Sequence, residues 1–183
     1  MKRLYLLIAL TLCLLLTACG KNSSAESFAQ FSEQLSQKTD ISFSARLRCE
    51  YDDRTLSFVL DCVSDAGGCT VTVAEPSIIR GISAHVESGK SSLHFSDLIL
   101  DTGDADSFGL SPMSALPLFL DALRNGCPTA SWEENGEIVS DLSASDVLTV
   151  RLYLDKYSLS PTHAEMISNG KVRVFIEISD WNT

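Results

Sequence analysis

The stretch from residue 41 to residue 62 reads ISFSARLRCEYDDRTLSFVLDC and decides the fold. From Ile41 to Tyr51, apolar residues alternate with polar ones, which is the pattern of a strand with one buried face. A short polar turn breaks the alternation, which resumes from Leu56 to Cys62. Two such runs joined by a short turn predict a pair of antiparallel strands with a shared apolar face.

The same two-residue period recurs along most of the chain. Further strands are expected near residues 69–75, 80–87, 91–100, 129–134, 137–142, 146–155, 162–168 and 171–179. The Asn-Gly pairs at 135–136 and 169–170 favour tight hairpins. Within the strand at 91–100 the apolar phase slips around Asp97, which indicates a bulge or an end to one-sided burial. About ten strands with short turns predict a mostly antiparallel meander.

Two segments carry the helical period instead. The first, residues 24–38, opens with a capping-box sequence. The second begins at Ser111 or Ser114 and ends near residue 125, and Pro117 is compatible only with its first turn. Together with the strands, these helices place the chain in the α+β class. Their apolar stripes are formed by Phe28, Phe31 and Leu35 in the first helix and by Met113, Leu116, Leu120 and Leu123 in the second.

The start of the chain has the three parts of a secretory signal. A positively charged beginning precedes an apolar run of 13 residues, Leu4 to Leu16. This run is shorter than the roughly 20 residues that span a bilayer as a helix. The Leu-Thr-Ala-Cys-Gly sequence at 16–20 looks like the lipobox of bacterial lipoproteins. That resemblance implies cleavage after Ala18 and a diacylglyceryl group on Cys19.

The lipid anchor sets the expected organisation and location. We expect residues 1–18 to be a cleaved signal peptide, 19–23 the lipidated cysteine with a short linker, and 24–183 a single domain. Two acyl chains hold a protein stably on a membrane, so the chain is expected on the extracytoplasmic side of the cell membrane. Gly20 is not an inner-membrane retention signal of the Asp type, which allows an outer-membrane location in a two-membrane cell.

The surface charge narrows the classes of partner. Removing residues 1–18 takes the formal net charge from −10 to −12. Nucleic-acid binding calls for patches of Lys and Arg, so an acidic chain argues against it. Electrostatic adhesion to anionic lipid heads is disfavoured for the same reason. The lipid on Cys19 therefore accounts for membrane binding, and a protein partner is left open.

Four further cysteines belong to the mature chain, and disulfides are permitted outside the cytoplasm. Cys62 and Cys69 flank a six-residue turn and share the apolar parity of their strands. They could lie opposite each other at a separation that a disulfide tolerates, so we predict a bridge between them. Cys49 and Cys127 either form a second bridge or remain buried thiols.

Catalytic and metal-binding signatures are weak. Asp101-Thr-Gly matches the aspartic-protease sequence, but those enzymes need two carboxylates and the chain has no second copy. The acidic turn that follows lacks the ligand spacing of an EF-hand. His85 and His94 fall on the polar faces of adjacent strands without an evident third ligand. We therefore expect no enzyme, no cofactor and no metal site.

The order of elements resembles the lipoprotein-carrier fold of the LolA/LolB/LppX type over most of residues 24–181. The matching features are the leading helix, the strand at 41–51, the segment 71–76, the helix at 111–125, and residues 152–155 followed by Ser-Pro. The resemblance implies a strongly curved, unclosed antiparallel barrel with both helices against its concave face. It also implies a hydrophobic groove between sheet and helices that takes a lipid or another apolar ligand.

The apolar face of the predicted sheet supplies the candidates for such a groove. They are Phe43, Leu47, Phe58, Leu60, Leu116, Leu120, Leu152 and Val174. The alternative is that the helices fill the space completely, giving a structural or protein-interaction lipoprotein with an ordinary core. One departure from the carriers matters: those that release cargo are soluble, whereas Cys19 tethers this chain. Receiving, retaining or presenting a ligand fits a tethered protein better than shuttling does.

Overall fold

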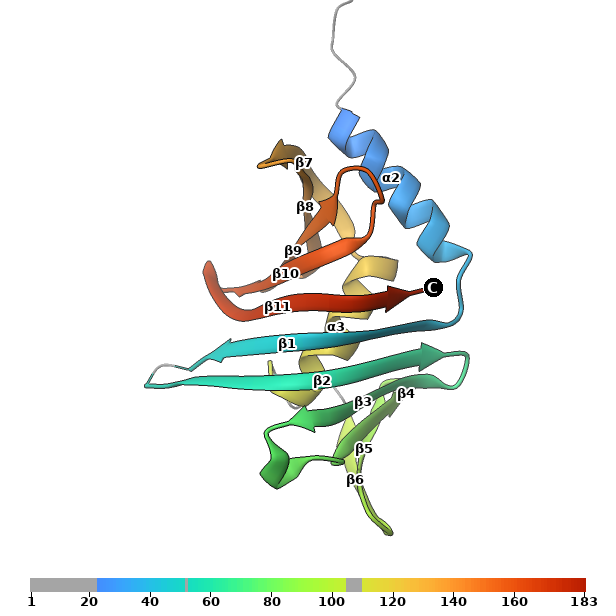
Figure 1. The fold of residues 1–183 in the computed structure, drawn as a ribbon, viewed down its shortest axis with the longest axis vertical. Helices are drawn as coiled ribbons and strands as arrows, with labels where there is room; N and C mark the ends of the chain where they lie inside the picture. Colours follow the sequence, from blue (N-terminus) through green and yellow to red (C-terminus); the bar gives the residue numbers. More distant parts are fainter. Residues whose placement is uncertain (1–22, 52, 105–109) are drawn as a thin grey trace, which may run out of the picture.

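The computed structural model describes residues 23–51, 53–104 and 110–183 (Figure 1). The predicted signal peptide and Cys19 lie outside this part of the chain, as do Asp52 and residues 105–109. The side chain of Asp104 is also not described. Within the described ranges, no helix combines the length and the apolar character needed to cross a membrane.

The described residues form two α-helices, one short 3-10 helix and eleven strands. Their bounds are α2 Ser23–Ser36, β1 Ile41–Glu50, β2 Thr55–Asp65, β3 Gly68–Glu75, η1 Ser77–Ile79, β4 Ser83–Glu87, β5 Lys90–Phe95, β6 Leu98–Asp104, α3 Pro112–Asn125, β7 Cys127–Glu134, β8 Glu137–Ser145, β9 Leu148–Asp155, β10 Pro161–Ser168 and β11 Lys171–Asn182.

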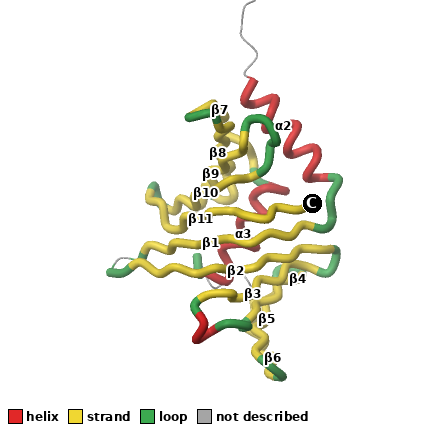
Figure 2. Tube along the Cα trace, in the orientation of Figure 1, coloured by secondary structure: helices red, strands yellow, loops and turns green. Residues whose placement is uncertain are grey.

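All the strands belong to one antiparallel sheet, in the order β6-β5-β4-β3-β2-β1-β11-β10-β9-β8-β7. The chain therefore runs outward from β1 to the β6 edge, and α3 then carries it across to the β7 edge. From there the strands return to β11, which pairs with β1 in the middle of the sheet. Figures 1 and 2 show α3 behind the central strands and α2 beside the β7–β10 half. The prediction of an unclosed, curved antiparallel sheet with two helices is confirmed.

The segment that was predicted to be one strand, residues 91–100, forms two strands in the structure. The run at 91–100 was expected to be continuous, but β5 ends at Phe95 and β6 begins at Leu98 after a two-residue turn. Ser96 takes a positive φ of 55° in this turn. The sequence hides the turn because Ser96-Asp97 contains none of the Gly, Asn-Gly or Pro signals that mark hairpins. The slip in apolar phase at Asp97 was therefore a chain reversal rather than a bulge.

The start of α3 confirms one expectation and overturns another. Ser111 is the N-cap: the Ser114 N–H donates to its Oγ at 3.2 Å, and the Ser111 N–H donates to Ser114 Oγ at 3.0 Å. Pro117 was expected only in the first turn, but it is the sixth residue of the helix. It offers no N–H to the preceding turn. Burial of Leu116 and Leu120, each at most 3% exposed, offsets that loss.

Removing the Ser111 hydroxyl should weaken this helix start. The Ser111→Ala variant is expected to lose about 0.5–2 kcal/mol of unfolding free energy, because the Ser114 N–H loses its side-chain acceptor and keeps only the Ser111 carbonyl. Urea denaturation followed by circular dichroism measures the loss. Ser111→Thr keeps the hydroxyl and serves as the control. Equal stability of the Ala and Thr variants would show that the cap contributes nothing.

The hydrophobic core lies between the concave face of the sheet and α3. The alternate residues of β1 that were expected to point inward are buried from Ile41 to Cys49. Tyr51, the last residue of the predicted alternation, lies beyond the end of β1 and is exposed. Phe119 of α3 is completely buried and meets the Phe43 ring edge-on, with 6.1 Å between ring centroids. Trp181 of β11 also packs against Phe43, with 5.1 Å between ring centroids. These aromatic contacts join α3 to the two central strands.

The convex face of the β7–β11 half carries paired polar and aromatic side chains. Arg151 donates two hydrogen bonds to the Asp141 carboxylate, at 2.8 and 3.0 Å, and lies 5.2 Å from the Trp132 ring centroid. These bonds raise the pKa of Arg151 above its ordinary value. Next to this pair, the His163 ring stacks on Tyr153 with 3.9 Å between centroids. This face is accordingly a well-satisfied polar surface rather than a second core.

Candidate apolar-ligand site

The predicted groove residues lie in the packed core. Seven of them are at most 3% exposed, and Phe58 is half-buried. The seven are Phe43, Leu47, Leu60, Leu116, Leu120, Leu152 and Val174. None of the eight lines the pocket or the groove described below. In this structure α3 side chains fill the middle of the concave face, so a ligand reaching these residues would have to displace them.

An apolar pocket lies instead towards the β6 edge of the sheet, under the first turn of α3. We call it the edge pocket; its volume is about 120 Å³. The side chains that line it come from β4, β5, β6 and α3: Ala84, Val86, Ser91, Leu93, Thr102, Ser111, Met113 and Ser114.

The polar groups around the edge pocket are bonded to one another. Ser91 and Thr102 share a hydroxyl–hydroxyl hydrogen bond of 2.8 Å, and Thr102 Oγ1 also donates to the Ser91 carbonyl at 2.9 Å. Ser111 and Ser114 are joined by the capping box. Among the residues that the structure describes, none with a charged side chain lines the pocket. The pocket is therefore lined mainly by alkyl and thioether groups, and it suits a ligand without charge.

Apolar surface continues from the edge pocket along the β5–β6 hairpin. Leu93 pairs with Leu100 and Phe95 with Leu98, and residues directly opposite in an antiparallel pair share a face. Leu93 lines the pocket, so the other three extend the same face outward; we call these four residues the apolar strip. Phe95, Leu98 and Leu100 are 55%, 65% and 56% exposed. Adjacent exposed apolar side chains of this kind make the apolar strip a candidate interaction surface.

The apolar strip was missed at the sequence level because residues 91–100 were expected to form a single strand. In a single continuous strand, Leu98 and Leu100 would be separated from Leu93 by five and seven residues of extended chain. The hairpin folds them back beside Phe95 and Leu93. The phase slip at Asp97 was the one signal that could have revealed this arrangement.

The predicted cysteine pair is close but is not directly opposed. Cys62 faces Val71, and Cys69 faces Ser64, so the two cysteines are diagonal neighbours. A two-residue turn after Asp65 shifts the register by two positions from that of a symmetric six-residue turn. The two Sγ atoms are 3.6 Å apart as free thiols. The bridge itself stays a prediction.

The other two cysteines differ sharply in environment. Cys49 is buried, and burial together with the neighbouring Glu50 raises its pKa to about 11. Cys127 is exposed at the start of β7, so it is not the buried thiol that was one of the two expectations for it. For Cys62, the hydrogen bond it shares with Cys69 and its burial both raise its pKa. Cys49 and Cys62 are therefore protonated and shielded at neutral pH.

Thiol counting tests this description and the predicted bridge. In the native mature chain, a thiol-reactive dye should label Cys127 quickly, and Cys127→Ser should remove the fast reaction. After unfolding in guanidinium without reductant, we expect two reactive thiols, Cys49 and Cys127, if Cys62 and Cys69 are bridged. A count of four, with Cys19 lipidated, would contradict the bridge.

The motifs with catalytic potential occupy surface positions. Asp101 is exposed on β6, and its carboxylate accepts the Gly103 N–H at 2.9 Å. The His85 and His94 rings lie 6.5 Å apart, and His85 hydrogen-bonds Thr70 at 3.0 Å. Across the described ranges, no group of three or more His, Cys, Asp and Glu side chains is arranged to hold a metal ion.

Comparison with known proteins gives a likeness of fold. No family model matches the sequence, and no curated protein matches it. An uncharacterised conserved protein from Thermus thermophilus superposes with a TM-score of 0.50 at 10% identity, covering 87% of this chain and 86% of that one. A DUF1329 family protein from Desulfovibrio piger gives the same score and identity, covering 87% and 91%.

A third similar structure belongs to the LolA superfamily, the type that the order of elements in the sequence resembles. The LolA superfamily protein from Nitrosomonas europaea superposes with a TM-score of 0.48 at 12% identity, covering 84% of this chain and 92% of that one. The architecture described above has the features that define that type: one unclosed antiparallel sheet and helices against its concave face. The chain therefore has a LolA-like fold.

Proposed function

We propose that this chain is a lipoprotein, held on the extracytoplasmic side of a membrane by Cys19, that binds the end of an acyl chain or a similar apolar group. The edge pocket is the binding site in this proposal, and the apolar strip is its entrance. The observation that carries it is the continuity of the two: an uncharged pocket opens onto side chains that are more than half exposed.

The size of the edge pocket defines what it can hold. Its volume of about 120 Å³ is similar to the roughly 150 Å³ apolar cavity that accepts benzene. A few methylene groups fit, and each contributes about 0.8 kcal/mol on burial. The rest of an acyl chain would lie along Phe95, Leu98 and Leu100, which removes their apolar surface from water. The site thus suits the tip of a lipid better than a whole lipid molecule.

The expected anchor favours a stationary role. A protein tethered by its first mature residue stays at one membrane, so it would receive, retain or present a ligand there. The anchor rests on the signal and lipobox sequences at residues 1–20. Replacing Cys19 by serine should release the chain from the membrane fraction while leaving the edge pocket intact.

A titration with a fluorescent polyene fatty acid tests the site. The protein is residues 19–183 with Cys19→Ser, which keeps every described residue. Filling the pocket with Ala84→Trp should weaken binding at least tenfold, as should Leu98→Glu, which puts a charge on the exposed strip without touching the core. Val63→Trp is the matched control, because Val63 is 52% exposed on β2 and outside the site. Equal affinities for all four proteins would contradict the proposal.

A second function has its own support in the filled core. Because seven of the eight expected groove residues are packed, the chain also suits a protein-interaction lipoprotein without a ligand. This candidate predicts no saturable fatty-acid binding by any of the four proteins. The same titration therefore separates the two functions.

A further inference from the structure

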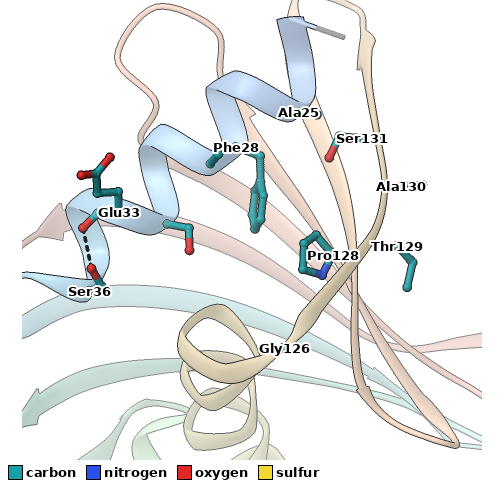
Figure 3. A pocket seen from close by; sticks show the side chains of 11 residues that line it. Ala25, Phe28, Glu33, Ser36, Gly126, Pro128, Thr129, Ala130 and Ser131 are labelled. Carbon is teal, nitrogen blue, oxygen red and sulfur yellow. Dashed lines mark hydrogen bonds between the residues drawn. The ribbon is translucent and has the colours of Figure 1, made fainter. Parts of the chain in front are cut away.

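A second concave surface lies between α2 and β7 (Figure 3). It is at the other end of the sheet from the edge pocket, because β7 and β6 are the two outermost strands in the strand order. We call it the side groove; its volume is about 650 Å³, within the range of protein ligand sites. Figure 3 shows α2 and β7 diverging from Ala25 and Ser131 towards the end of α3. The lining residues are Ala25, Phe28, Ala29, Ser32, Glu33 and Ser36 of α2, with Gly126 and Pro128–Ser131 from the α3–β7 segment.

The side groove runs along the edge of β7 rather than over one of its faces. Four consecutive residues, Pro128 to Ser131, line it. Successive side chains of a strand point to opposite faces, so a cavity that meets all four approaches the strand from the side. Among the described strands, β7 pairs with β8 alone and ends the sheet. An edge strand presents backbone donors and acceptors to a further strand.

The two elements that border the groove have one sign of charge. They carry Glu26, Glu33, Glu133 and Glu134, and neither α2 nor β7 contains a Lys or Arg. Lys156 pairs with Glu133 at 2.7 Å, and the net charge of α2 and β7 together stays negative with this lysine counted. A negatively charged surround attracts basic polypeptide and repels anionic lipid heads.

We propose that the side groove binds an extended, basic segment of a partner protein as an added strand on β7. Strand addition lets backbone hydrogen bonds supply affinity while side-chain positions supply specificity. The α2 border from Ala25 to Ser36 spans about 16 Å, the length of about five extended residues. Small side chains at Ala25, Ala29 and Ser32 leave room for the segment, and Glu33 adds negative charge to the α2 border of the groove.

Binding of a defined peptide to the full chain, purified in detergent, tests this proposal. The probe is a fluorescein-labelled heptapeptide in which Lys and Val alternate, followed by fluorescence anisotropy. Saturable binding is expected, weakened at least tenfold by Ala29→Trp, which fills the groove, and by Glu33→Arg, which reverses its charge. Gln30→Trp is the matched control: Gln30 is exposed on the same helix but does not line the groove. It should leave affinity unchanged.

The backbone of the probe supplies a second control. Methylation of alternate amide nitrogens removes hydrogen-bond donors without removing charge, and it should also weaken binding at least tenfold. The proposal is overturned if the methylated peptide binds as well as the parent, if Ala29→Trp and Gln30→Trp behave alike, or if the parent does not bind. Self-association of the chain that Ala29→Trp abolishes would identify a second copy as the occupant and would equally overturn it.

Discussion

Replacing Phe119 by alanine is expected to lower the free energy of unfolding by about 3–5 kcal/mol. Phe119 is completely buried, and its ring packs edge-on against Phe43 of the central strand. The substitution removes a large apolar side chain and leaves a cavity between α3 and the sheet. Urea denaturation followed by circular dichroism and tryptophan fluorescence measures the change.

The neighbouring Leu118 provides a matched control on the same helix. Leu118 is half-buried, so Leu118→Ala should cost only about 1 kcal/mol. Equally small losses in the two variants would show that α3 is not packed against the sheet. The middle of the concave face would then be open to a ligand, as the sequence-level expectation had it.

Replacing Gly68 by alanine is expected to cost about 2–4 kcal/mol. Gly68 begins β3 with a φ of +132°, which L side chains rarely adopt, and a Cβ there would overlap the backbone carbonyl oxygen of Val86 on β4. Neither atom can move without disturbing the β3–β4 pairing. Thermal and urea unfolding report the loss, and a shift of the Ala84 and Val86 strand would also disturb the edge pocket.

A second glycine, Gly89, separates the two costs expected at Gly68, the backbone strain of a positive φ and the overlap of the new Cβ with Val86. Gly89 also has a positive φ, +78°, but a Cβ added there meets nothing within 4 Å. Gly89→Ala should therefore cost only the backbone strain, about 1 kcal/mol. If Gly68→Ala proved no more costly than Gly89→Ala, the close approach of β3 to β4 would be contradicted.

The strand pattern of the fold was predictable because one face of the sheet is buried and the other is not. From Ile41 to Cys49 the burial of β1 follows the alternation in the sequence. The hairpins at the two Asn-Gly pairs were predicted correctly for a different reason: that dipeptide readily adopts the positive φ angles of a tight turn. The turn at Ser96-Asp97 carries no such signal, so the sequence predicted a single strand where the structure has two, β5 and β6.

The candidate site was less predictable because it depends on which side chains fill the space in front of the sheet. Sequence periodicity identifies an apolar face but not whether a helix occupies the space in front of it. The choice between groove and core at Leu47 and Leu116 is therefore made by the packing of α3. The edge pocket lies where α3 begins, between its first turn and strands β4, β5 and β6.

The register of the β2–β3 hairpin shows a similar limit. Parity alone correctly placed Cys62 and Cys69 on one face, because side chains two residues apart share a face. The choice between an opposed and a diagonal pair depends on the length of the turn, which the Asp-Ala-Gly-Gly sequence leaves open. The two-residue turn gives the diagonal pair, with its sulfur atoms 3.6 Å apart.

The two edges of the unclosed sheet carry the two proposed binding surfaces, which differ in character. The β6 edge offers apolar side chains and an uncharged pocket, whereas the β7 edge offers an acidic groove beside a free strand edge. If both proposals hold, a tethered chain could hold a lipid at one edge and a basic protein segment at the other. The Ala84→Trp and Ala29→Trp variants address the two surfaces separately.

The most direct test of the apolar site uses the two methionines of the mature chain as reporters. Met113 lines the edge pocket, whereas Met166 is completely buried in the core. With the methionine methyl groups labelled with carbon-13, decanoic acid is titrated into residues 19–183 carrying Cys19→Ser. A saturable shift of the Met113 methyl signal with an unmoved Met166 signal is the predicted result. An unmoved Met113 signal, or equal shifts of both, would contradict binding in the edge pocket.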